Sequence, residues 1–197
     1  MISNDLNIFL IFLSALLVNN ILLIRFIGLC SFFGISQRIE SSLGMGAAVT
    51  FVMVMSSSVT WLIYNFLLIP FHLQYLRTIS FILVIATLVQ LVERFIRKYN
   101  PTLYQALGIY LPLVTTNCAI LAAAFLGIDY HLSFLQNLIY ALGISLGYLL
   151  AIILFSGLRE RIALSPIPKA FKGVPIAFLT ASLMSLAFLG FKGLFGL

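Results

Sequence analysis

Long apolar runs separated by short polar connections make up almost the whole chain. A transmembrane helix needs ~20 mostly apolar residues, and these runs have about that length. The pattern predicts six membrane-spanning helices, over residues 6–24, 43–69, 77–96, 103–126, 133–156 and 173–195. The predicted fold class is therefore an all-α integral membrane protein, with residues 1–197 forming a single transmembrane domain.

Composition supports a lipid environment. Of the 197 residues, 62% are hydrophobic and 8% are charged, and the mean hydropathy is +1.17. A soluble domain of this size could not bury so much apolar surface. The first apolar run is preceded by Asp5 and by no Lys or Arg, so we expect it to stay as an anchor and not to be removed as a signal peptide.

The basic residues predict the orientation in the membrane. The first, third and fifth connections carry Arg38, then Arg94, Arg97 and Lys98, then Arg159, Arg161, Lys169 and Lys172. The even connections hold only Arg77, and the C-terminal end holds Lys192. By the positive-inside rule, the odd connections are cytoplasmic, and both termini lie on the outer, periplasmic side of a bacterial inner membrane. This placement explains the net charge of +6 without nucleic-acid binding.

The two halves of the chain resemble each other weakly. "LLVNN" (16–20) is similar to "PLVTTN" (112–117), "SLGMG" (42–46) to "ALGIS" (141–145), and "LRTISFIL" (76–83) to "FKGVPIAF" (171–178). All three pairs are separated by just under one hundred residues. They predict a three-helix repeat, about 1–100 and 101–197, whose second copy is inserted upside down because three is odd. Folds of this kind place their working site near the membrane midplane, on interrupted helices.

Polar interruptions occur in the first and fourth predicted helices. The residues concerned are Asn19 and Asn20 in the first helix, and Pro112, Thr115, Thr116 and Asn117 in the fourth. Proline removes a backbone donor and clashes with the preceding turn. Freed backbone groups cannot face lipid, so they must be buried in protein or line a cavity, where Thr and Asn side chains can satisfy them. A tolerated kink is the purely structural interpretation.

The two cysteines, Cys30 and Cys118, each follow one of these interruptions. A cysteine in a membrane helix is usually a small apolar filler. The alternative is ligation, because thiolates suit iron–sulfur clusters. A [2Fe–2S] cluster takes four thiolates, so this chain would supply half of the ligands and a partner subunit or a second copy the rest. Half-helix N-termini at the midplane would offset part of the cost of an anionic group in lipid.

Several motifs resemble the RnfA/RnfE and NqrD/NqrE family over essentially the whole chain, and they are most similar to its RnfA branch. They are "LVNNILLIRFIGLC", "LRTISFILVIA", "ALGIYLPLVTTNCA", "LRERIA" and "LTASLMSLAFLGF". The family commonly has proline after the first cysteine, where this chain has Ser31.

The resemblance implies a membrane subunit of an ion-translocating oxidoreductase without a complete active site of its own. Rnf complexes couple electron transfer between ferredoxin and NAD to Na+ or H+ movement, and the Nqr relatives oxidise NADH and reduce quinone. It also implies that Cys30 and Cys118 hold one [2Fe–2S] cluster together with a paralogous RnfE-like subunit, paired antiparallel. The direction of electron flow and the cation stay open.

Two other classes of function are compatible with the sequence. An inverted-repeat secondary transporter or permease subunit is one alternative, and a purely structural assembly subunit is another; in both, the cysteines would be packing residues. The sequence has no Gly-rich phosphate loop, so we expect no direct NAD binding. We expect Arg25 to snorkel to the cytoplasmic interface, and Asp129 and His131 to be solvated in an outer loop.

Overall fold

The computed structural model describes residues 7–71, 73–99, 111–166, 168 and 171–191. Every regular element in these residues is helical, which confirms the all-α class. The elements are α1 (Asn7–Leu13), η1 (Ser14–Val18), α2 (Leu29–Ile35), α3 (Ile39–Ile63), η2 (Tyr64–Leu68), η3 (Gln74–Leu76), α4 (Arg77–Tyr99), α6 (Leu111–Thr115), α7 (Cys118–Asp129), α8 (Phe134–Ala163) and α9 (Val174–Leu189).

Three of the apolar helices are long enough to cross a membrane by length and composition. They are Ile39–Leu68, Arg77–Phe95 and Phe134–Ala163, and they correspond to the second, third and fifth predicted spans. Three shorter apolar helices, Ile8–Val18, Leu113–Asp129 and Val174–Leu189, correspond to the first, fourth and sixth. Parts of the fourth and sixth predicted spans, 103–110 and 192–195, lie outside the described residues.

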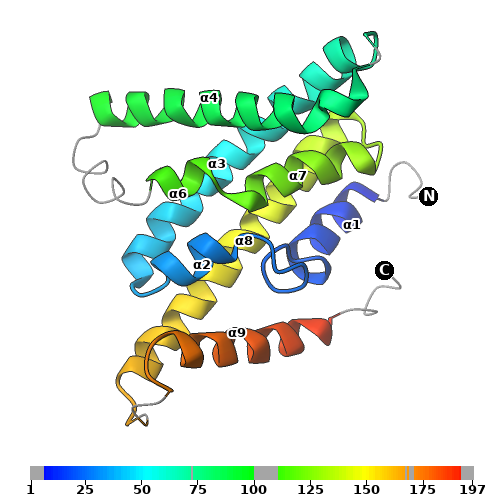
Figure 1. The fold of residues 1–197 in the computed structure, drawn as a ribbon. Coiled ribbons are helices and arrows are strands. Elements are labelled where there is room, and N and C mark those ends of the chain that lie inside the picture. Colours follow the sequence, from blue (N-terminus) through cyan, green and yellow to red (C-terminus); the bar gives the residue numbers. More distant parts are fainter. Residues whose placement is uncertain (1–6, 72, 100–110, 167, 169–170, 192–197) are drawn as a thin grey trace.

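Helices α3 and α8 form the centre of the molecule and make the most extensive contact between elements. Figure 1 shows α4 along one side of this pair and α9 along the opposite side, with α1, α2, α6 and α7 between them. The α2–α3 connection, the end of α4, the start of α6 and the end of α8 lie at one end of the molecule (left in Figure 1). The start of α1, the end of α9 and the α3–α4 and α7–α8 turns lie at the other end.

Glycines on α8 allow the first half-helix to pack closely against it. A Cβ atom at Gly147 would lie 2.8 Å from the Leu16 carbonyl oxygen, and one at Gly143 would lie 2.9 Å from the Phe12 carbonyl oxygen. Any larger side chain would push η1 and α1 away from α8. This contact brings the interruption that follows Val18 against the middle of α8.

Candidate functional site

The first helix ends at Val18, and residues 19–28 form an irregular segment before α2 begins. The interruption predicted at Asn19 and Asn20 within the first span, 6–24, lies where the helix ends, and the chain is not helical again until Leu29. Asn20, which is fully buried, holds this segment. Its Oδ1 accepts from the Leu22 and Leu23 backbone N–H groups at 3.0 and 3.3 Å, and its Nδ2 donates to the Gly147 carbonyl at 2.9 Å. One side chain thus satisfies the freed backbone and anchors the segment to α8.

Two further contacts support the same segment. The Asn19 amide donates to Ser14 Oγ at 3.3 Å, a local contact within the first half-helix. The Ser185 hydroxyl on α9 donates to the Leu23 carbonyl at 2.7 Å. The segment is therefore bound by α8 and α9, so its backbone polar groups face protein where lipid could not satisfy them.

The fourth helix breaks between α6 and α7, at Thr116 and Asn117. Pro112 lies within α6, and Thr115 is the last residue of α6. Within the described residues the chain is helical at Pro112, and the irregular positions, Thr116 and Asn117, come after Thr115. Asn117 makes the break: it is the N-cap of α7, and its Oδ1 accepts from the Ala119 backbone N–H at 3.0 Å.

Asn20 and Asn117 do the same work in the two breaks. Each side-chain oxygen accepts from the backbone N–H two residues later. The half-helices that follow, α2 and α7, begin near each other and run in opposite directions (Figure 1). Unpaired N–H groups and the positive ends of both helices are thereby brought to one place.

The two cysteines lie at these helix starts. Cys30 is the second residue of α2 and Cys118 is the first residue of α7. Both side chains are exposed on the surface of the chain, and the two thiols are close enough to interact directly. This exposure leaves both thiols accessible to another chain or to lipid.

Gly28 brings the two helix starts into contact. Its backbone N–H donates to Cys118 Sγ at 3.0 Å. Its φ of 92° lies in the left-handed region, and a Cβ atom there would lie 3.1 Å from the Ala119 Cβ. Only glycine accommodates both the conformation and the close approach without strain. The short distance between two thiols 88 positions apart in the chain depends on this residue.

A third ligand from the same chain is not present among the described residues. No group of three or more His, Cys, Asp or Glu side chains gathers in that part of the structure. The donor set at the exposed thiols is two sulfur atoms, with backbone N–H groups around them. Two soft ligands on an open surface fit half of a four-thiolate site, and the remaining positions are accessible to another chain.

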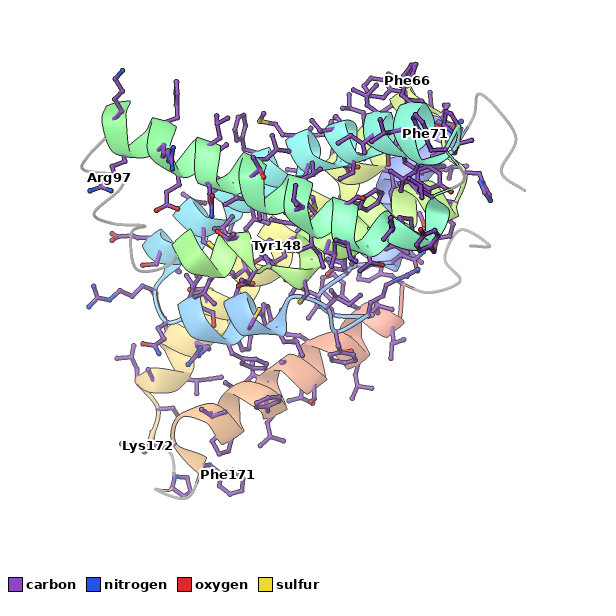
Figure 2. The ribbon with its side chains drawn as sticks, turned by 45° about the horizontal axis from the view of Figure 1, so that its top comes forward. Phe66, Phe71, Arg97, Tyr148, Phe171 and Lys172 are labelled. Carbon is purple, nitrogen blue, oxygen red and sulfur yellow. The ribbon has the colours of Figure 1, made fainter. Side chains whose placement is uncertain are left out.

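Tyr148, which lies behind the thiols, is not marked by any sequence motif. Tyr148 on α8, labelled at the centre of Figure 2, is fully buried, and its hydroxyl lies 2.7 Å from Ser31 Oγ. Its polar surroundings include Asn117 and both cysteines. A tyrosine within an apolar helix carries no local signal that it faces a site. Gly28, two positions before Cys30, is the residue whose type indicates an unusual backbone conformation here.

Arg25 and Asp129 both lie near the α7–α8 turn. The Arg25 guanidinium donates to the Tyr130 hydroxyl at 2.8 Å, beside the α7–α8 turn. That turn is at the opposite end of the molecule from Arg97 and Lys172 (Figures 1 and 2), so Arg25 lies away from these two residues of the connections predicted to be cytoplasmic. Asp129 is half-exposed and forms an ion pair with Arg77 at 2.7 Å, which joins the start of α4 to the end of α7.

At the end of the molecule where α8 finishes, two charged side chains of α8 form hydrogen bonds with the end of α2 and the start of α3. Arg159 donates to the Phe33 carbonyl at 2.9 Å and to Ser36 Oγ at 2.8 Å, at the end of α2. Glu160 accepts from the Ile39 N–H at 3.1 Å, at the start of α3. These contacts hold α2, and therefore Cys30, against the central helix.

Comparison with known proteins finds relatives over almost the whole chain. Residues 8–195 match the family described as "Rnf-Nqr subunit, membrane protein". The chain is 57% identical, over 188 residues, to the RnfA-type component of the ion-translocating oxidoreductase complex of Syntrophotalea carbinolica, covering 95% of this chain and 97% of the relative. It is 53% identical, over 184 residues, to the corresponding component of the Na(+)-translocating ferredoxin:NAD(+) oxidoreductase complex of Acetobacterium woodii, covering 93% of this chain and 96% of the relative.

A third relative extends the agreement to another organism. The corresponding component of the ion-translocating oxidoreductase complex of Azoarcus sp. is 52% identical over 185 residues, covering 94% of this chain and 96% of the relative. The family match extends through both half-helix pairs and both cysteines. The chain therefore belongs to the Rnf–Nqr subunit family of membrane proteins.

Proposed function

We propose that this chain is the RnfA component of an Rnf-type complex, in which electron transfer between ferredoxin and NAD is coupled to Na+ or H+ translocation. The names of the relatives from Syntrophotalea carbinolica and Acetobacterium woodii support this assignment. The chain would act as one membrane component of a larger assembly. Its own contribution is the pair of thiols, because no group of three or more His, Cys, Asp or Glu side chains gathers among the described residues.

The observation that carries the proposal is the exposed pair of neighbouring thiols at the starts of two opposed half-helices. Cys30 and Cys118 would bind a [2Fe–2S] cluster, and a paralogous RnfE-like subunit would supply the other two thiolates. When bound, such a cluster accepts and releases one electron within the low-dielectric core. An exposed half-site is what a cluster shared between two chains requires, since each chain must leave two coordination positions open.

The surrounding residues of this chain make negative charge tolerable at that depth. The Gly28 N–H donates to Cys118 Sγ. The amide groups at the starts of α2 and α7 add partial positive charge. Asn20 and Asn117 hold those helix starts in place through the bonds described above. These groups offset part of the cost of burying an anionic site in lipid.

Iron analysis of the purified complex tests the proposal. The complex would be isolated anaerobically with its paralogous subunit, and iron content and the EPR spectrum after dithionite reduction would be recorded. Wild type should give a [2Fe–2S] signal that Cys30→Ser and Cys118→Ser each remove, because a serine hydroxyl is a poor substitute for a soft thiolate. Co-purification of the partner subunit controls for assembly. A signal unchanged in both variants would leave the cysteines as packing residues and exclude the cluster.

We also infer six membrane crossings in two inverted three-helix repeats, with both termini on the periplasmic side of the inner membrane. The alternation of helix ends between the two sides of the molecule supports this inference (Figure 1). The equivalent roles of Asn20 and Asn117, and the opposite directions of α2 and α7, are the relations that an inverted repeat produces.

Reporter fusions test that orientation. Alkaline phosphatase joined after Leu197 should be active and green fluorescent protein at the same position should be dark, because the C-terminus would be periplasmic. Fusions after Tyr99 should give the reverse pattern. Fluorescence from the C-terminal fusion would overturn the inferred topology.

A further inference from the structure

We propose that Tyr148 is a positioning residue for the thiol pair, acting through Ser31 and Gly28 to hold the N–H group that donates to Cys118. This inference rests on the proposed function, because it assigns Tyr148 an effect on the electron carrier bound there.

The hydrogen bonds form a directed chain. Ser31 Oγ donates to the Gly28 carbonyl at 2.9 Å. A serine has one hydroxyl proton, and a carbonyl can only accept. The proton of Ser31 is therefore used, and the Tyr148 hydroxyl must be the donor in its 2.7 Å bond to Ser31 Oγ. Tyr148 thus fixes the orientation of the Ser31 hydroxyl, and Ser31 fixes the Gly28 carbonyl.

Gly28 connects this chain of bonds to the thiol. The same residue whose carbonyl accepts from Ser31 donates its own N–H to Cys118 Sγ at 3.0 Å. Its left-handed φ of 92° makes its orientation sensitive to what holds it, because glycine is free to leave that conformation. The bond from Ser31 restricts that freedom, and Tyr148 supports the bond from the rigid central helix α8.

Tyr148 is also placed between the two helix starts. Ser31 belongs to α2, and Asn117, the N-cap of α7, is the other polar side chain beside the Tyr148 hydroxyl. Tyr148 is completely buried, so no water competes for its hydroxyl. A buried hydroxyl between α2 and α7 holds their spacing, and with it the spacing of the two thiols.

The consequence is electronic as well as structural. Hydrogen bonds to ligand sulfur atoms are among the factors that set the reduction potential of an iron–sulfur cluster. An N–H bond to sulfur favours the more negative, reduced state. Removing the Tyr148 hydroxyl should loosen Gly28, weaken its bond to Cys118 Sγ and make the bound cluster harder to reduce.

The test compares Tyr148→Phe and Ser31→Ala in the anaerobically purified complex. The readouts are iron content and the midpoint potential from an EPR-monitored redox titration. Both variants should keep iron and lower the reduction equilibrium constant by roughly threefold to tenfold, the upper end being about 59 mV for a one-electron couple. The double variant should shift no further than the larger single shift, because both substitutions interrupt one chain of bonds.

Tyr140→Phe is the matched control. Tyr140 is a buried tyrosine on the same helix, about two helical turns before Tyr148, and its ring contacts Tyr130 and not the thiols. Its potential should equal that of wild type. A decrease of the same size in this control would show that the effect is general softening of α8 and would overturn the inference.

The remaining outcomes separate this inference from the proposed function. Wild-type complex without iron at this pair would refute the proposed function and this inference with it. Iron in wild type, with potentials unchanged in Tyr148→Phe and Ser31→Ala, would refute only the positioning role. Additive shifts in the double variant would also refute it. If Tyr148→Phe fails to assemble, Ser31→Ala alone decides: a lowered potential supports the inference and an unchanged one overturns it.

Discussion

Replacing Cys118 by serine is expected to stop electron transfer and cation transport together, both falling to background. The hydrocarbon core of a bilayer is about 30 Å thick, and an electron needs a carrier within it. The exposed thiols of Cys30 and Cys118 are the described groups that can hold one. If the inverted repeat moves a cation in response to the redox state of that carrier, loss of the carrier abolishes both activities.

The measurement uses the complex in sealed vesicles, with ferredoxin-dependent NAD reduction and uptake of Na+ or H+ recorded in parallel. Thr87→Ala is a suitable control, because Thr87 is exposed on α4 and bonds only to the Leu83 carbonyl of its own helix at 2.8 Å. It should retain both activities. Cation translocation that continued unchanged after Cys118→Ser had removed the cluster would contradict the coupling.

Asn20→Ala is expected to lower the stability of the folded complex by about 2–4 kcal/mol, since each buried polar group left without a partner costs ~1–3 kcal/mol. The substitution removes the acceptor for the Leu22 and Leu23 N–H groups and the donor to the Gly147 carbonyl. Water is scarce at this depth, so the freed groups stay unsatisfied. The irregular segment before α2 should loosen, and Cys30 with it.

Asn19→Ala provides the control from the neighbouring residue. Asn19 is only partly buried, and its amide makes one longer bond, 3.3 Å, to Ser14 Oγ. Its loss should cost about 0.5–1 kcal/mol, the typical net value of one such bond. Midpoints of thermal unfolding in detergent, measured for both variants, check the difference. Equal losses of stability in the two variants would show that the Asn20 side chain does not stabilise the irregular segment more than its neighbour does.

Local physical chemistry makes much of this protein predictable from its sequence. Apolar runs of membrane-spanning length must form helices, because lipid offers no partners for backbone groups. Polar residues inside two of those runs therefore mark the breaks, and the side chains of Asn20 and Asn117 do accept from backbone N–H groups there. The positions of Cys30 and Cys118 after the breaks can also be read directly from the sequence. These features depend on residues only a few positions apart.

Tertiary structure decides which of these residues meet. The break between α6 and α7 lies at Thr116 and Asn117, because the asparagine side chain caps the new helix that starts at Cys118. Arg25 donates to Tyr130 at the end of the molecule opposite to Arg97 and Lys172, although the positive-inside pattern groups it with them. Neither outcome follows from hydropathy.

The site itself is the clearest case of a feature that only the fold assembles. The bond from Gly28 to Cys118 joins residues 90 positions apart, and the bond between Ser31 and Tyr148 joins residues 117 positions apart. By itself, the sequence determined the helices, the two breaks and the two thiols that follow them. The packing of α2, α7 and α8 decided that the thiols are neighbours with a glycine N–H and a buried tyrosine behind them. Long-range contacts depend on the summed packing of all helices, which no short stretch of sequence encodes.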